Sequence, residues 1–539
     1  MKGLPLGLND FKDLIKGNFV YVDKTMYIHE LVKRQKGLYF LSRPRRFGKS
    51  LLLSTLYYLF KGERELFEGT WIYDKWSWEE YPVVRIDMTD MKSETLEKVE
   101  YGLRAVVQNN AEEYGIELES LRVDAGYGFS ELIVKLYRKF GKPVVVLIDE
   151  YEKPVLDNVI EKGKVEEIRR LLRGFYGTLK AHVDKIRFLL ITGLTKFTKM
   201  GVFSALNNLT DISFKPEYAQ MLGYTHEEVI EYFDEYIARY LQLTGLSKDE
   251  FLEMFREYYD GYSFDGIWYD EEGKDRRVYN PYAVLLFFDN MRFAPYWSET
   301  GAPSFVYEYL KKHGVSRQRL LEDKVSQSDF SSFEIEDNPP NMFLAQAGYL
   351  SLKLVTDRTD PEPVYELYIP NKDVRRGLEK IMFAVEHKVS LSEVMSKSNE
   401  LMVALKMKDV EKMVEVLDGI YAKVSWRVRR RIERSGGKDR LTHLESFYQG
   451  VMVSLMESAG LSVVVEEESA GGSADVVVRM NGVVYVIELK VDRSAREALE
   501  QIKERGYHEP YRGKEVYLVG ISVSSKSGRI KDWECERVW

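Results

Sequence analysis

The 539-residue sequence predicts an α/β fold with a parallel-sheet domain at residues 1–225, a helical region at 226–420 and a second α/β unit at 421–539. Three observations support this division. In the first part, short apolar runs alternate with helical stretches, which is typical of a parallel sheet covered by helices. The middle part is mostly helical and rich in aromatic residues, and a winged-helix-like arrangement is one form it could take. In the last part, an Asn-Gly pair joins two β-branched runs, which indicates a β-hairpin.

The composition is that of an ordinary globular protein, with 45% hydrophobic and 30% charged residues. The single cysteine, Cys535, cannot form an intramolecular disulfide, which fits a reducing compartment. Neither a signal peptide nor an apolar run of about 18 residues is evident, so we expect a cytoplasmic protein without membrane association. The net charge of −8 excludes a uniformly basic DNA-coating protein, but it leaves room for a local basic patch.

Short apolar runs mark the expected strands of the first domain and a strand pair in the middle region. They lie at residues 38–41, 83–86, 144–148, 187–191, 350–354 and 365–369. The first strand leads into Gly48-Lys49-Ser50 and then into a helix-like apolar stretch. This is the second half of a P-loop in its usual strand–loop–helix setting. Gly48 would let backbone amides face a phosphate, Lys49 would reach the β and γ phosphates of ATP, and Ser50 would bind Mg²⁺.

One position departs from the P-loop pattern. Arg43 stands where the first glycine is expected, and Arg45 and Arg46 follow it. We expect these three arginines to surround the phosphate site. The alternative is a basic loop that is merely solvated.

The third expected strand ends in Asp149-Glu150. Ligands bind at the carboxyl edge of a parallel sheet, so Asp149 could hold Mg²⁺ through water and Glu150 could polarise the attacking water. The fourth strand ends at Thr192, and Lys196 follows it. Either side chain could sense the γ phosphate, although both could equally be a structural cap or a surface group.

The hairpin at residues 475–490 carries the sharpest chemical signal. A two-residue Asn-Gly turn pairs Met480 with Val483 and thereby places Asp475 directly opposite Glu488. Lys490 lies two residues beyond Glu488 and therefore projects from the same face.

Two facing carboxylates repel each other, so a cation should compensate them. Mg²⁺ suits carboxylate oxygens and water, and Mn²⁺ is a second candidate. Lys490 could orient or help to deprotonate a water there. Glu445, on a helix upstream, could approach the same metal, and Gln501, on a helix downstream, could contact a substrate phosphate. The alternative is an exposed hairpin with solvated charges, and for Glu445 and Gln501 a plain helix surface.

Together these segments resemble a prokaryotic family that joins an N-terminal AAA-ATPase-like domain to a C-terminal domain of the PD-(D/E)XK nuclease superfamily. The resemblance covers nearly the whole chain. It rests on segments 21–25, 43–50, 148–151, 192–197, 203–209, 259–262, 279–281, 346–350 and 369–371, and on Asp475, Glu488, Lys490, Gln501 and Tyr507.

The resemblance implies a restriction-endonuclease-like core in the last domain, with Asp475, Glu488 and Lys490 as its catalytic triad. The family's own P-loop has arginine in the first-glycine place, so Arg43 does not argue for an inactive site. Ser473-Ala474 replaces the Gly-Arg pair that often precedes the aspartate, which removes one plausible phosphate contact.

A basic segment, residues 423–440, leads into the last domain. Its arginines include Arg427, Arg429, Arg430 and Arg431. Such a segment could neutralise several phosphates and give sequence-independent, salt-dependent affinity for nucleic acid. A charge run is more often a solvated surface, which remains the alternative here.

The leading hypothesis is an enzyme in which ATP binding or hydrolysis controls a Mg²⁺-dependent nuclease that acts on DNA. The sequence leaves open whether the chain assembles into a homo-oligomer. A second hypothesis is an ATP-driven switch whose C-terminal fold binds nucleic acid or protein without cutting. A third is a nuclease whose nucleotide domain binds ATP without hydrolysing it.

Overall fold

The computed structural model describes residues 1–158, 161–196, 209–300, 303–315, 320–321, 324–332, 339–435, 440–469, 472–480 and 482–539. Within these ranges, side chains are not described at 162, 300, 303, 331–332, 425–435, 466–469 and 472–474. The chain forms two compact units. Unit 1 comprises Met1–Trp297 and Gln318–Asp373, and unit 2 comprises Ser298–Arg317 and Val374–Trp539.

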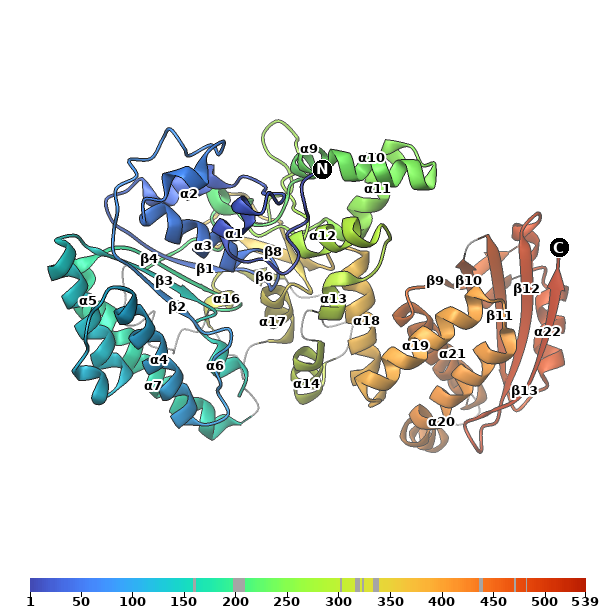
Figure 1. The fold of residues 1–539 in the computed structure, drawn as a ribbon. Helices are drawn as coiled ribbons and strands as arrows, with labels where there is room; N and C mark the ends of the chain where they lie inside the picture. Colours follow the sequence, from blue (N-terminus) through green and yellow to red (C-terminus); the bar gives the residue numbers. More distant parts are fainter. Residues whose placement is uncertain are drawn as a thin grey trace. The chain divides into compact units, whose positions relative to one another are not determined.

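Unit 1 is built on a five-stranded parallel sheet in the order β2-β3-β4-β1-β5. The strands are β1 (Gly37–Ser42), β2 (Val83–Asp87), β3 (Val144–Asp149), β4 (Ile186–Gly193) and β5 (Thr210–Asp211). Helices α1 (Phe11–Lys16), α2 (Thr25–Val32) and α3 (Lys49–Phe60) lie on one side of the sheet in Figure 1; α4 (Leu96–Glu113), α5 (Ala125–Phe140) and α7 (Lys162–Ala181) lie on the other. The α/β fold and the four strands predicted in this region are confirmed.

The sheet brings the polar strand ends together. All residues of β3 and β4 are buried, as expected for strands covered on both faces. In the register, Leu41 pairs with Thr192, and Asp87 pairs with Asp149. The carboxyl ends of β1, β3 and β4 therefore meet at one edge, where ligands bind in folds of this type.

The remainder of unit 1 is largely helical. It contains α6 (Lys153–Leu156), α9 (His226–Tyr232), α10 (Asp234–Thr244), α11 (Lys248–Tyr259), α12 (Pro281–Asn290), α16 (Asp329–Ser332) and α17 (Pro340–Ala347), and α13 (Tyr296–Thr300) begins in it. Its small antiparallel sheet has the order β6-β8-β7, formed by β6 (Val325–Ser326), β7 (Ser351–Leu354) and β8 (Val364–Tyr368). The strand pair predicted in the middle region is therefore present.

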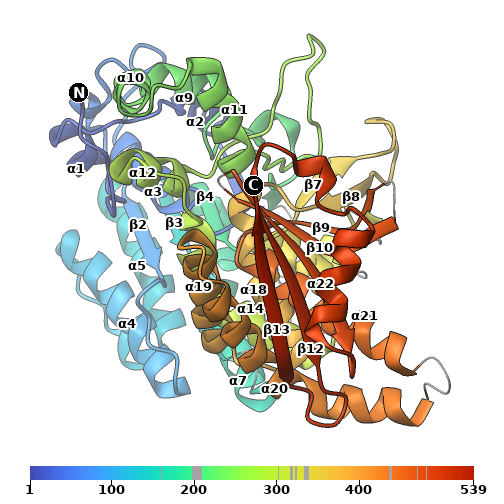
Figure 2. The same ribbon diagram turned by 90° about the vertical axis from the view of Figure 1, so that its right-hand side faces the viewer.

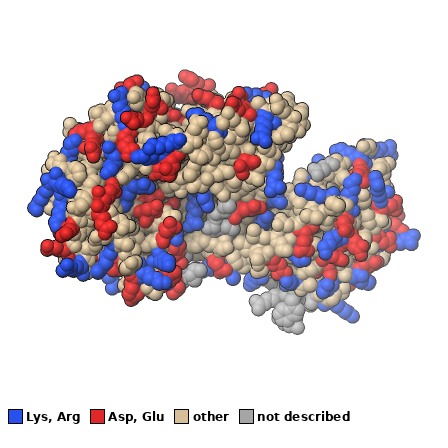
Figure 3. All heavy atoms as spheres, in the orientation of Figure 1, with Lys and Arg blue, Asp and Glu red and all other residues tan. Residues whose placement is uncertain are grey.

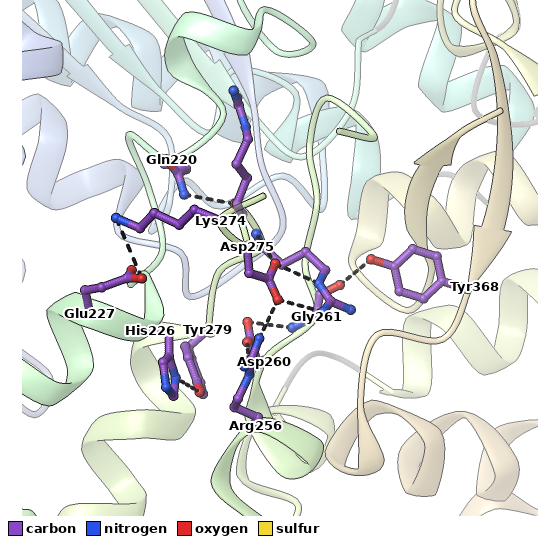
Figure 4. A network of polar contacts seen from close by, with 12 residues as sticks. Gln220, His226, Glu227, Arg256, Asp260, Gly261, Lys274, Asp275, Tyr279 and Tyr368 are labelled. Carbon is purple, nitrogen blue, oxygen red and sulfur yellow. Dashed lines mark hydrogen bonds and ion pairs between the residues drawn. The ribbon is translucent and has the colours of Figure 1, made fainter. Parts of the chain in front are cut away.

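A partly buried polar network ties α11 to the small sheet (Figure 4). Asp260 lies 3.6 Å from Arg256, and Asp275 forms ion pairs with both Arg256 and Arg277. The hydroxyl of Tyr368 donates to the carbonyl of Gly261, whose φ of +100° suits a residue without a side chain. The Tyr-Asp-Gly-Tyr segment at 259–262 is thereby fixed against β8.

Asp260 provides a test of this network through the pH dependence of stability. Burial, together with the charge of Asp275, raises the pKa of Asp260 to about 6. Because the folded pKa lies above the unfolded value of roughly 4, the folded state loses stability as pH rises from about 4 to 6, by about 3 kcal/mol in all. Asp260→Asn should therefore raise the thermal unfolding midpoint at pH 8 and change it little at pH 4. Arg256 keeps Asp275 as a partner in this variant.

The control for this variant is Asp289→Asn, at an exposed position of α12. It should shift the midpoint little at either pH. A destabilised Asp260→Asn protein at pH 8 would contradict the raised pKa.

Unit 2 contains a mixed five-stranded sheet in the order β13-β12-β11-β10-β9. Its strands are β9 (Ser462–Ser469), β10 (Gly472–Met480), β11 (Val483–Val491), β12 (Glu515–Val523) and β13 (Ile530–Val538). The β11–β12 pair is parallel, and the other pairs are antiparallel. Helix α22 (Ala495–Glu504) lies on one face of this sheet, and α19 (Leu391–Lys406), α20 (Val410–Ser435) and α21 (Arg440–Ser458) lie on the other (Figures 1 and 2).

Helices well upstream of the sheet also belong to unit 2. They are α14 (Pro303–His313) and all but the first two residues of α18 (Lys372–His387). The Tyr485 hydroxyl of β11 donates to the carbonyl of Leu405 in α19, and the Tyr421 hydroxyl of α20 donates to the carbonyl of Tyr448 in α21. These buried bonds make residues 374–420 part of the packed C-terminal unit. In the part of the chain that the structure describes, no helix has the length and apolar character needed to cross a membrane.

Candidate functional sites

The loop after β1 has the backbone geometry of a phosphate-binding loop. Helix α3 begins at Lys49, and Gly48 before it has a φ of +91°, which favours glycine. The first amides of α3 have no partner within the helix and carry its positive dipole end. The loop and helix therefore offer an anion site at the carboxyl edge of the parallel sheet.

Arg43 does not face this site, which corrects one expectation from the sequence. Its side chain is 2% exposed and donates to the carbonyls of Ser42, Ser213 and Tyr218 at 2.7–3.1 Å. Its guanidinium carbon lies 4.1 Å from the centre of the Phe264 ring. Arg43 therefore anchors the loop to the segments behind it, because its two terminal nitrogens, Nη1 and Nη2, donate to backbone carbonyls.

Lys49 is held on the loop itself. Its ammonium donates to the carbonyls of Arg43 and Pro44 at 3.0 and 3.3 Å and lies 3.1 Å from a carboxylate oxygen of Glu150. Glu150 has a φ of +50°, a left-handed conformation that costs energy for a residue with a side chain. Such strained residues cluster at functional sites, and Glu150 pairs here with the loop lysine.

Asp149 receives two short hydrogen bonds. Ser50 donates to one carboxylate oxygen and Thr192 to the other, both at 2.6 Å. Burial raises the pKa of Asp149, and these two donors oppose the rise. A hydroxyl next to a buried carboxylate is a donor set that fits Mg²⁺, since this ion takes oxygen ligands and keeps several waters.

The two sensor candidates have different partners. Thr192 is fully buried and contacts Asp149, whereas Lys196 forms an ion pair with Asp211 of β5 at 2.9 Å. Residues 197–208, which include much of the segment that resembled the family, lie outside the described residues.

An apolar cavity of about 150 Å³ adjoins the loop. Residues 46–48 of the loop and Leu51, Leu52 and Thr55 of α3 contribute to its wall, and the rest comes from three separate parts of unit 1. These parts are residues 5–28, 221–224 and 281–285. An apolar hollow beside a phosphate loop suits a nucleoside, whose ring has two apolar faces.

In unit 2, the predicted hairpin register is confirmed. The pairs run from Met480–Val483 to Val476–Ile487, so Asp475 and Glu488 are the next residues on the two strands. The amide of Asp475 donates to a Glu488 carboxylate oxygen at 3.4 Å, and the amide of Leu489 donates to Asp475 at 2.8 Å.

Glu488 is the centre of this cluster, with 1% of its side chain exposed. Lys490 and Gln501 both donate to its Oε1 atom, at 2.9 and 2.6 Å. Burial and then the charge of Asp475 raise the pKa of Glu488 to about 7, although Lys490 opposes the shift. One lysine therefore does not fully neutralise the two carboxylates, and a divalent cation bound between them would reduce their repulsion.

Glu445 reaches the same strand from α21. Its carboxylate accepts a hydrogen bond of 2.9 Å from the amide of Val491, at the end of β11. Within the described part of the chain, no three His, Cys, Asp or Glu side chains gather as a metal-binding group. The carboxylate pair of Asp475 and Glu488 is therefore the donor set that the hairpin presents.

One further contact was not anticipated from the sequence. The side-chain amide of Gln449 donates to the carbonyl of Asp475 at 2.8 Å. Gln449 lies one helical turn beyond Glu445 in α21, and a shared helix face was the signal that could have revealed it.

The predicted nucleic-acid contacts divide into two groups. Arg427, Arg429, Arg430 and Arg431 lie in the second half of α20, and their side chains are outside the described set. Gln501 lies on α22, and its side-chain amide donates to Glu488, so Gln501 is more than a helix-surface glutamine. On the face drawn in Figure 3, basic and acidic side chains are interspersed over both units.

Comparisons with known proteins assign a family to the N-terminal part of the chain and another to its C-terminal part. Residues 5–203 match the family described as "Predicted AAA-ATPase", and residues 443–533 match the PD-(D/E)XK nuclease superfamily. An "Uncharacterized protein in vnfD 5′region" from Azotobacter chroococcum mcd 1 is 34% identical over 537 residues, which covers 98% of each chain. The chain belongs to this AAA-ATPase-like family with a C-terminal PD-(D/E)XK nuclease superfamily domain. No solved structure matches it.

Membership of the family confirms the resemblance inferred from the sequence. The P-loop and Asp149-Glu150 lie within the AAA-ATPase match, and the carboxylate hairpin lies within the nuclease-superfamily match. The roles of the individual side chains, the substrate and the metal stay predictions.

Proposed function

We propose that this AAA-ATPase-like protein is a nuclease in which ATP controls the Mg²⁺-dependent cleavage of DNA phosphodiester bonds. The observation that carries the proposal is the cluster of Asp475, Glu488 and Lys490 on β10 and β11, in which Glu488 is buried and the other two are half-buried. Buried carboxylates of like charge are costly, and they are kept where chemistry needs them.

In the nucleotide half, the apolar cavity takes the adenosine and the loop amides take the phosphates. Lys49 leaves Glu150 and moves onto the β and γ phosphates, which frees Glu150 to polarise the attacking water. Asp149 and Ser50 hold Mg²⁺, while Thr192 keeps Asp149 in place and Lys196 senses the γ phosphate.

In the nuclease half, Asp475 and Glu488 hold Mg²⁺ or Mn²⁺, with Glu445 supporting the strand end beside them. Bound metal lowers the pKa of a water and stabilises charge on the phosphate that is attacked. Lys490 orients that water. Gln501 donates to Glu488, which keeps the carboxylate in the required rotamer, and it also contacts a substrate phosphate.

Nucleic acid binds along the basic segment, residues 423–440, which precedes the sheet of unit 2. Arg427, Arg429, Arg430 and Arg431 neutralise backbone phosphates, so affinity should fall steeply with salt. We further propose a cytoplasmic protein that is able to form a homo-oligomer. In it, residues 1–225 form the ATPase domain, and 421–539 form the nuclease-like domain. Residues 226–420 form a helical region that transmits the change, and its last part, 374–420, packs within unit 2.

A cleavage panel tests the proposal. Single-stranded, duplex and branched DNA and RNA would be incubated with the full chain and Mg²⁺ or Mn²⁺, with and without ATP. Cleavage of DNA that depends on metal and changes with ATP is the expected result. Binding without any cleavage would favour an ATP-driven switch whose C-terminal fold holds nucleic acid or protein.

Glu150→Gln should separate ATP binding from ATP hydrolysis. The amide keeps the size of the side chain but cannot polarise water, so we expect phosphate release to fall by about a hundred-fold or more. ATP affinity should stay within a few-fold of the wild type, because Lys49 and the loop amides remain. Phosphate release and binding of a fluorescent ATP analogue are the measurements. Unchanged turnover would remove Glu150 from the reaction, and no turnover in either protein would favour a domain that binds ATP without hydrolysing it.

A further inference from the structure

The segment that leaves β4 is fastened to the turn after β3 by two consecutive side chains, Tyr151 and Glu152. The Tyr151 hydroxyl donates to the carbonyl of Thr195 at 3.0 Å. The carboxyl oxygen Oε1 of Glu152 accepts hydrogen bonds from the amides of Leu194 and Thr195. The two side chains thus satisfy two amides and one carbonyl of the backbone at residues 194–195.

Glu152 is fully buried, with 0% of its surface exposed. Its second carboxyl oxygen, Oε2, has no hydrogen-bond partner among the described residues. Burial, followed by the charge of Glu150, raises the pKa of Glu152 well above its usual range, which favours the protonated form. A neutral carboxyl group accepts the two amide bonds without placing a further charge beside Asp149 and Glu150.

Gly193 makes room for this contact. A Cβ atom at position 193 would overlap the Oε2 atom of Glu152 and the ring of Tyr151. The glycine therefore serves the close approach of the carboxyl group to β4, and its φ is not in the left-handed region.

The fastened segment carries groups of the nucleotide site. Thr192, at the end of β4, donates to Asp149, and Lys196, at the other end of the segment, pairs with Asp211. In the sheet register, Thr192 and Gly193 lie beside Leu41 and Ser42, the last residues before the phosphate loop. A shift of residues 193–196 would move Lys196 and loosen Thr192 against Asp149.

We propose that Glu152 is a positioning residue for ATP hydrolysis, whose buried carboxyl group holds residues 193–196 against the turn after β3 and so sets Thr192 and Lys196 relative to Asp149. The inference rests on the proposed ATPase function and deepens it. Glu152 itself acts through these residues and contacts neither nucleotide nor metal.

Two variants of similar size test the role. Glu152→Gln keeps an oxygen that accepts the two amide bonds, whereas Glu152→Met fills the space without an acceptor. We expect the Gln variant to keep near wild-type kcat. The Met variant should lose kcat by on the order of ten- to a hundred-fold, with KM for ATP within about two-fold, because misplacement affects the reaction more than binding. A generally weakened fold would not be rescued by Gln in this way.

Amide hydrogen exchange of Leu194 and Thr195, measured without nucleotide, separates this inference from the proposed function. The two amides should lose protection in the Met variant and keep it in the Gln variant. If the wild type hydrolyses no ATP, the proposed function fails, while the exchange data still decide whether Glu152 holds the segment.

Gly193→Ala is the second route, should the Met variant fail to fold. It pushes the Glu152 carboxyl group away from β4 and should lower kcat with little change in KM. Equal kcat in the wild type and the Met variant would overturn the inference. Equal losses of kcat in the Gln and Met variants would also overturn it, because they would show that the carboxyl proton of Glu152 is needed and not its hydrogen-bond acceptor.

Discussion

Asp475→Ala and Asp475→Asn are expected to lower the rate of DNA cleavage by about a thousand-fold or more while DNA binding persists. Asp475 faces Glu488 across the hairpin and supplies half of the carboxylate pair proposed to hold the metal. Asn keeps an oxygen that accepts the Leu489 amide bond, so its inactivity would report the lost charge and not a damaged hairpin.

The pKa of Glu488 makes this result easier to interpret. The charge of Asp475 is one of the causes that raise this pKa to about 7. Without that charge, Glu488 ionises more readily, so lost cleavage cannot be ascribed to a protonated Glu488. The remaining explanation is the lost ligand.

The measurements are single-turnover cleavage with Mg²⁺ and fluorescence anisotropy of labelled DNA with EDTA. Asp532→Asn is the matched control, because Asp532 is exposed on β13 of the same sheet, away from the carboxylate pair. It should cleave at the wild-type rate. Cleavage that persists in Asp475→Asn would remove Asp475 from the site, and binding without cleavage in the wild type as well would favour the non-cutting switch.

Lys49→Ala should weaken ATP binding by about a hundred-fold, because one buried ammonium would otherwise make charge-assisted bonds to the phosphates. In the structure, Lys49 has 4% of its side chain exposed and already lies among the loop carbonyls and Glu150. ATP-dependent changes in DNA cleavage should vanish with it. Cleavage that needs metal alone should remain, because Lys49 belongs to the other site.

Lys61→Ala is the control for this variant. Lys61 lies at the opposite end of α3, where it pairs with Glu113 at 2.9 Å. Titration of a fluorescent ATP analogue should give near wild-type affinity for Lys61→Ala and a large loss for Lys49→Ala. Equal affinities in all three proteins would exclude the loop as the phosphate site.

Local sequence determined the features that depend on short-range geometry. The Asn-Gly turn has two residues, and side chains alternate along a strand, so the pairing of Met480 with Val483 could be extended to Asp475 and Glu488 by counting. The strand that ends in Asp149 could also be predicted locally, since a short apolar run is typical of a buried strand. The left-handed residue before α3 could be predicted because glycine adopts that conformation readily.

Long-range packing decided the rest. The direction of the Arg43 side chain depends on Ser213, Tyr218 and Phe264, which are far away in the sequence. The P-loop pattern does not contain these contacts, so on its own it predicted that Arg43 faces the phosphate. The contacts of Glu152 likewise depend on a distant segment, because the amides that donate to its carboxyl group belong to Leu194 and Thr195, directly after β4. The reach of α19 and α20 into the C-terminal unit likewise depends on Tyr485 and Tyr421. Contacts between distant segments are set by how elements pack, and no local pattern encodes them.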